Sequence, residues 1–312
     1  HKEDNGDIYA RGSQDMKCVG IQYMEAIKKL KSEKKTFIRT IHLSYNPEEE
    51  LSGVLGMKKF VHMPEFKNLN VGYALDEGYA NPTEKFNLFY GERMVWRFFV
   101  RCSGQPGHGS QFLPNTAGEK LRKVINSFLT FRAEEENKLK ENPDLKLGDV
   151  TTLNLTLLQG GVQFNVVPAE LSVGFDVRVA ITEDLVELEN KFKRFCAEAG
   201  EGVTLDFVLK YQNAGKTCVE DGQCHWWDAF AKACADENVC LEKSVFPAAT
   251  DSKYLRMKGI PALGFSPMNH TPILLHDHNE YLNESIFLRG IDIYCTIISA
   301  LANVAETNIY VD

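Results

Sequence analysis

Several features are missing from this 312-residue sequence, and each absence argues against a class of protein. No apolar run reaches the roughly 20 residues that a membrane-spanning helix requires, and residues 1–7 have neither the positive charge nor the apolar core of a signal peptide. The formal net charge of −8 argues against nucleic acid as a partner. The eight cysteines contain no C-x-x-C pair, so neither a zinc knuckle nor a disulfide scaffold is indicated. We therefore expect a cytoplasmic protein with free thiols that binds neither nucleic acid nor a membrane.

The composition is that of a globular protein, and the length suffices for two domains. Periodicity in the middle of the chain predicts, in order, strand 94–102, helix 121–131, strands 150–158 and 171–179, helix 182–195 and strand 203–209. This β-α-β-β-α-β order is that of a ferredoxin-like fold. We therefore predict an inserted α+β domain over residues 91–211. It would split an α/β domain, with a mostly parallel sheet, into residues 1–90 and 212–312.

Carboxylates follow three predicted strands of the first domain. The strands and the acidic residues after them are 8–10 with Asp15, 37–45 with Glu48, Glu49 and Glu50, and 71–75 with Asp76 and Glu77. Strand ends of a parallel sheet face one crevice, so we expect these side chains to lie close together. Carboxylates that are close repel one another, and a cation relieves the repulsion. The pattern favours metal-assisted hydrolysis; the alternative is an acidic surface at a helix N-terminus.

Two histidine motifs lie outside these segments. His276 and His278 flank Asp277, an aspartate that could orient either ring as a metal ligand. His108 lies between glycines in the stretch Gly104–Ser110, where the backbone can approach a ligand closely. The alternatives are surface histidines in a loop for the first motif and an ordinary turn for the second.

Together these motifs resemble the dinuclear zinc amidohydrolases of the aminoacylase/carboxypeptidase G2 family. The segments that carry the resemblance are Tyr9–Lys17, Pro47–Glu50, Ala74–Gly78, Gly104–Ser110, Asn165–Ala169, Pro247–Asp251, Pro261–Pro267 and Leu274–Glu280. The resemblance implies a split zinc-hydrolase domain and an inserted lid or dimerisation domain. It also implies a homodimer formed through the insert, and a small-molecule substrate, an N-acyl-L-amino acid, that is hydrolysed to a carboxylate and a free L-amino acid.

The resemblance also implies a role for each matching residue. Two zinc ions would be bound per subunit, although carboxylate and imidazole ligands also accept cobalt or manganese. Asp15 would bridge the two ions, Glu50 and His276 would complete one site, and Glu77 would ligate the other. Further roles fall to Glu49 as the general base for a zinc-activated water, His108 as the oxyanion donor across a dimer, and Asn165 and Arg178 as substrate-binding residues.

The sequence departs from the family in one respect. The family has an H-x-D motif upstream of the Asp15 segment, and its histidine ligates zinc; no H-x-D precedes Asp15 here. We therefore expect that an N-terminal part of the fold is absent and that the Glu77 site lacks its histidine. The chain would then be a piece of a longer enzyme, or a truncated, catalytically deficient homologue that acts as a non-catalytic dimerising subunit.

Overall fold

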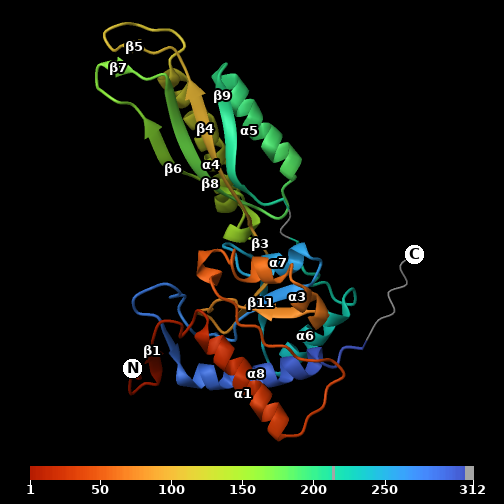
Figure 1. Ribbon diagram of the computed structural model, residues 1–312. Helices are drawn as coiled ribbons and strands as arrows, with labels where there is room; N and C mark the ends of the chain where they lie inside the picture. Colours follow the sequence, from red (N-terminus) through yellow and green to blue (C-terminus); the bar gives the residue numbers. More distant parts are fainter. Residues whose placement is uncertain (213–214, 306–312) are drawn as a thin grey trace, which may run out of the picture. The chain divides into compact units, whose positions relative to one another are not determined.

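The computed structural model describes residues 1–212 and 215–305, which form two compact units (Figure 1). The first unit consists of residues 1–91, 215–244 and 250–305, and the second of residues 92–212 and 245–249. Each unit has its own hydrophobic core, so the two are described separately. The functional division into a catalytic domain and a lid or dimerisation domain stays a prediction.

A four-stranded mixed sheet lies at the centre of the first unit. Its strands, in spatial order, are β10 (Leu241–Phe246), β3 (Phe86–Glu92), β11 (Ala262–Phe265) and β2 (Ala74–Asp76). Strand β11 runs parallel to β2 and antiparallel to β3. The sequence-based assignment missed β3, because almost all of its residues are buried and the apolar-polar alternation of a half-exposed strand is absent.

Helices and short strands surround this sheet. The helical elements are α1 (Lys17–Ser32), the 3₁₀ turn η1 (Glu49–Leu51), α2 (Met57–Phe60), α3 (Pro64–Leu69), α6 (His225–Asp236), α7 (Ser252–Met257) and α8 (Glu284–Leu301). Helix α8 contacts both α1 and α6 (Figure 1), and its apolar stripe buries Ile293, Tyr294 and Ile297 in the core. Among the helices of the described residues, none combines the length and the apolar character needed to cross a membrane.

Of the three strands expected to deliver carboxylates to one sheet edge, one is absent and one belongs to a different sheet. Residues 37–45 contain no strand: their alternating apolar residues do not pair with another strand, and Ile38, Leu43 and Tyr45 are exposed. Strand β1 (Asp7–Tyr9) exists, but it pairs antiparallel with β12 (Tyr281–Asn283) in a separate two-stranded sheet. Of the three, only β2 belongs to the central sheet.

The second unit confirms the predicted β-α-β-β-α-β order. The four long strands form an antiparallel sheet in the order β6 (Thr152–Gly160), β8 (Glu170–Val179), β4 (Met94–Ser103) and β9 (Val203–Lys210). Helices α4 (Ala117–Glu141) and α5 (Leu185–Ala199) pack against this sheet, and the turn η2 (Leu147–Asp149) precedes β6. The core contains stacked and tilted aromatic rings, with Phe128 5.6 Å from Phe98 and 5.1 Å from Phe192 between ring centroids.

Local sequence explains where the helices of the second unit begin. Helix α4 begins with a capping box: the Thr116 hydroxyl accepts from the Glu119 backbone N–H, and the Glu119 carboxylate accepts from the Thr116 N–H. At α5 the Asp184 carboxylate accepts from the backbone N–H groups of Val186 and Glu187. A short ladder of β5 (Gly107–His108) and β7 (Val166–Val167) completes the unit.

Candidate metal centre

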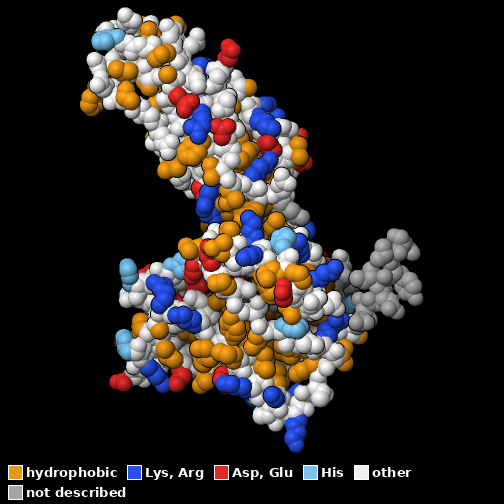
Figure 2. Space-filling view, in the orientation of Figure 1, with side chains coloured by type: hydrophobic (Ala, Val, Ile, Leu, Met, Phe, Trp, Pro, Cys, Tyr) orange, Lys and Arg blue, Asp and Glu red, His pale blue; other side chains and the backbone are white. Residues whose placement is uncertain are grey.

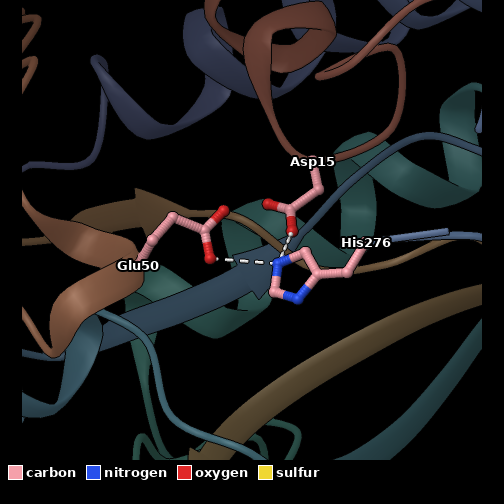
Figure 3. A group of neighbouring side chains, drawn as sticks. All are labelled: Asp15, Glu50 and His276. Carbon is pink, nitrogen blue, oxygen red and sulfur yellow. Dashed lines mark ion pairs between the residues drawn. The ribbon is translucent and has the colours of Figure 1, made fainter. Parts of the chain in front are cut away.

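Three side chains from distant parts of the sequence converge in the first unit. His276 Nε2 lies 3.0 Å from Asp15 Oδ2 and 3.0 Å from Glu50 Oε2 (Figure 3). One ligand atom from each residue lies within 4.8 Å of the others. Two carboxylate oxygens and one imidazole nitrogen are donors that zinc and similar divalent ions accept, so this group fits a metal ion.

Each of the three residues lies outside the central sheet. Asp15 is in the turn between β1 and α1, and its peptide bond to Met16 is cis. Glu50 belongs to the turn η1, and His276 lies in the loop before β12, with a positive φ of 63°. Their meeting point is therefore set by turns and loops.

The acidic triplet forms a tight turn and not the start of a long helix. Glu48 and Ser52 have φ values of 68° and 81°, and they border the single turn η1. Close packing permits only glycine at position 56, because a Cβ there would lie 2.0 Å from the carbonyl oxygen of Pro47. The turn gives its carboxylates different surroundings: Glu48 Oε2 accepts from the Leu55 N–H, whereas Glu50 Oε2 faces His276.

Glu49 lies among other acidic side chains. Burial, followed by the charges of Asp251 and Asp76, raises the pKa of Glu49 to about 8, although Lys253 opposes the shift. Burial also raises the pKa of Glu77, followed by the charges of Asp76 and Asp15 and a side-chain hydrogen bond with Asp15. These shifts show that ionised carboxylates would repel one another here, and a bound cation relieves such repulsion.

Asp76 and Glu77, at the end of β2, have different partners. Both Asp76 carboxylate oxygens are engaged: Oδ2 accepts from the Ser252 N–H and hydroxyl, each at 2.8 Å, and Oδ1 accepts from the Glu77 N–H at 2.9 Å. Glu77 instead interacts with Asp15. The three other predicted metal ligands, Glu50, Glu77 and His276, therefore lie near Asp15, although the sheet-edge argument for grouping the carboxylates was wrong.

The predicted residues of the second unit fall into two groups. His108 on β5 is opposite Val166 on β7, and the Gly109 N–H donates to the Asn165 carbonyl at 2.8 Å, so His108 and Asn165 are neighbours. Arg178 lies near the other end of the sheet, opposite Val95, and its Nε donates to Asp176 at 2.8 Å. Within this unit, Arg178 is thus separated from the other two.

Sequence reasoning assigned no role to two buried acidic residues near the centre. Asp251, at the start of α7, influences Glu49 electrostatically, and Glu280, before β12, contacts the turn that carries Asp15. Both belong to segments that carry the family resemblance, yet only burial and long-range contacts distinguish them from surface carboxylates.

Comparisons with known proteins agree on one family. The model of Peptidase family M20/M25/M40 matches residues 1–300. Aminoacylase-1 of Mus musculus is 56% identical over 303 residues, which cover 97% of this chain and 74% of the mouse protein. Among solved structures, aminopeptidase PepT from Bacillus cereus has a TM-score of 0.70 at 18% identity, covering 97% of this chain and 76% of that one. A dinuclear metal-binding M20 peptidase from Bacillus subtilis has a TM-score of 0.65 at 16% identity, and the match covers 91% of this chain and 71% of the Bacillus subtilis chain.

Proposed function

This chain belongs to peptidase family M20/M25/M40, a family of hydrolases, and from this membership we propose that it hydrolyses N-acyl-L-amino acids to a carboxylate and a free L-amino acid. The substrate class follows the name of the mouse relative, aminoacylase-1. The observation that carries the proposal is the convergence of Asp15, Glu50 and His276 in an arrangement that fits a metal ion. A non-catalytic dimerising subunit is not favoured, because it would not require this convergence.

The metal ligands are assigned to the first unit. Asp15, Glu50 and His276 would hold one ion, and Asp15 together with Glu77 would contribute to a second. We propose zinc, which imidazole and carboxylate ligands suit, and two ions, as in the bacterial peptidase described as dinuclear. A bound ion supplies Lewis-acid polarisation of the amide carbonyl and of water. For the second ion we name only Asp15 and Glu77, because this sequence contains no H-x-D motif before Asp15 that would add a histidine ligand.

Glu49 is assigned as the general base. Its carboxylate is beside the ligand Glu50 in sequence, yet it lies among Asp251, Asp76 and Lys253. A base whose pKa is near the working pH accepts a proton efficiently and can return it to the leaving amine. The raised pKa of Glu49, about 8 and caused mainly by burial, supports this role.

The second unit is assigned to substrate binding and dimerisation. We propose that Asn165 and Arg178 bind the substrate, with Arg178 holding its carboxylate, and that His108 stabilises the oxyanion in the site of a second copy. Hydrophobic side chains gather at the end of the unit that carries β5 and β7 (Figure 2), where Phe112 and Phe164 are fully exposed. Such a patch supports the prediction of a homodimer.

Cytoplasmic location stays a prediction. All eight cysteines are free. Four of them are buried, namely Cys18, Cys102, Cys196 and Cys234, and four are partly or fully exposed, namely Cys218, Cys224, Cys240 and Cys295. Free thiols are common in a reducing compartment.

The proposed reaction is tested by measuring free amino acid released from a series of N-acetyl-L-amino acids, with and without added Zn²⁺. Glu49→Gln should lower kcat by about 10²–10⁴-fold, because the amide cannot accept a proton. Glu48→Gln is the matched control: its amide oxygen can still accept from the Leu55 N–H, and the rate should stay near that of the unchanged protein. Absence of turnover with Zn²⁺ would contradict the proposed function; full activity of Glu49→Gln would contradict only the assigned base.

A further inference from the structure

One buried carboxylate holds the turn that carries Asp15. Glu280 is 3% exposed, and its Oε1 accepts from the backbone N–H groups of Gly12, Gln14 and Asp15 at 3.0, 2.7 and 3.2 Å. Its Oε2 accepts from Arg11 Nη1 at 2.9 Å. Four donors therefore surround one carboxylate, and three of them are backbone groups within the turn.

The two-stranded sheet places Glu280 at this point. Strands β1 and β12 pair antiparallel up to Tyr9 and Tyr281, so the residues after β1 pass the residue before β12. The Ala10 N–H donates to the Glu280 carbonyl at 3.3 Å, and the turn then closes around the Glu280 side chain. The strand that failed to join the central sheet thus has another role, which is to align the Asp15 turn with Glu280.

The same contacts join the Asp15 turn to the loop that carries His276. Arg11 Nη2 donates to the Asp277 carbonyl at 3.2 Å, next to His276 in sequence. The buried Gln14 side chain donates to the carbonyls of Pro272 and Tyr281 at 3.0 and 2.7 Å, and its oxygen accepts from the Leu274 N–H at 3.0 Å. The Asp15 and His276 side chains are partly exposed, so packing alone does not hold them together. The hydrogen bonds between the two loops limit how far Asp15 and His276 can separate.

We infer that Glu280 is a positioning residue for the metal centre: its carboxylate fixes the Asp15 turn against the His276 loop and so sets the affinity for the metal ion. The inference rests on the proposed function, because it requires that Asp15 and His276 bind a metal. Hydrogen bonds from backbone N–H groups to a charged carboxylate are stronger than those to a neutral acceptor. Groups that orient metal ligands in this way typically change metal affinity by about 10- to 100-fold when they are replaced.

Glu280→Gln tests this directly, because it keeps the size of the side chain and removes its charge. An amide has one accepting oxygen and one donating nitrogen. If the oxygen faces the three N–H groups, the NH₂ group meets the Arg11 guanidinium; if it is reversed, the NH₂ group meets the three N–H groups. In either orientation donors oppose donors, and the turn must shift. We expect Zn²⁺ affinity, measured on the 312-residue chain by competition with a chelator, to fall by about 10- to 100-fold.

Glu135→Gln is the matched control. Glu135 is also 3% exposed, accepts from the backbone N–H of Thr151 at 3.0 Å and pairs with Lys138, but it lies in α4 of the second unit. The thermal midpoint should fall for both variants, whereas Zn²⁺ affinity should fall only for Glu280→Gln. If Glu280→Gln does not fold, Arg11→Met serves in its place, because the Arg11 side chain is largely exposed; it should weaken Zn²⁺ binding to a smaller extent.

The outcomes distinguish the inference from the function on which it rests. If the unchanged chain binds no Zn²⁺, the proposed metal centre is wrong and the inference falls with it. If the unchanged chain binds Zn²⁺ and Glu280→Gln, or Arg11→Met in its place, binds equally well, only the inference is overturned. An equal loss of affinity in Glu135→Gln also overturns it, because the effect would then report general stability.

Discussion

Replacing Gly56 with alanine should damage the candidate centre without touching a metal ligand. Gly56 follows the turn of Glu49 and Glu50, and a Cβ there would lie 2.0 Å from the Pro47 carbonyl oxygen. The substitution adds one methyl group and leaves every proposed metal ligand in place, so it tests the packing of this turn. Because Cβ contacts under 3.0 Å essentially never occur, the two ends of the turn must separate by about 1 Å, the difference between 3.0 and 2.0 Å.

The expected loss can be worked out from this displacement. A misplacement of about 1 Å in a catalytic group can cost about 10²-fold in rate. At about 1.36 kcal/mol per tenfold change, that is about 2.7 kcal/mol of transition-state stabilisation. We therefore expect kcat/KM for an N-acetyl-L-amino acid to fall by about 10²-fold in Gly56→Ala. Far-ultraviolet circular dichroism should remain that of a folded protein, because the change is confined to one turn outside the central sheet.

Gly118→Ala is the matched control for this experiment. Gly118 lies in α4, where an added Cβ would meet only Leu171 Cδ1 at 4.0 Å. Alanine in a helix should stabilise the protein by about 0.5–1 kcal/mol and leave kcat/KM unchanged. If Gly56→Ala retained the activity of the unchanged protein, the steric reasoning about the turn would be refuted. The reasoning would also be refuted if Gly56→Ala lost folded structure to the same extent as activity, because the effect would then not be local to the turn.

Two further predictions concern the stability of the second unit. Phe128→Ala should reduce the free energy of unfolding, measured by urea denaturation, by about 3–5 kcal/mol, since the ring is fully buried. Phe112→Ala is the control and should change this free energy little, because the Phe112 ring is exposed. Burial opposes ionisation of Asp176, but hydrogen bonds from Arg178 and Arg97 outweigh it and lower the pKa of Asp176. The ionised carboxylate therefore stabilises the folded state above the unfolded-state pKa, and this stabilisation is lost as pH falls through the folded-state pKa. Asp176→Asn should therefore flatten the decline in stability below about pH 4, and a decline as steep as that of the unchanged protein would contradict this.

The second unit was predicted well because its signals are local. Alternating residues such as Trp96 and Phe98 indicate a strand with one buried face, and Thr116 with Glu119 indicates a helix start. These patterns depend on neighbours within a few positions. The aromatic core then follows, because every buried face has a partner within the same segment of chain.

The first unit was harder to predict because its strands depend on distant partners. Residues 37–45 carry a strand-like pattern but form no strand, and β3 forms without such a pattern. A strand requires a neighbour to accept its hydrogen bonds, and that neighbour is set by the fold. The strand-end argument therefore named Asp15 and Glu50 for a reason that the structure does not support, and the family resemblance is what joined them with His276.

The sequence by itself determined the composition, the helix caps, the order of elements in the second unit and the chemical identity of the candidate ligands. Only the tertiary structure decided that His276 Nε2 lies 3.0 Å from both Asp15 and Glu50, and that Glu280 is buried beneath the Asp15 turn. The physical reason is the range of the interactions involved. Backbone propensity and capping act between neighbours in the chain, whereas burial, pKa shifts and ligand geometry arise from contacts between residues far apart in it.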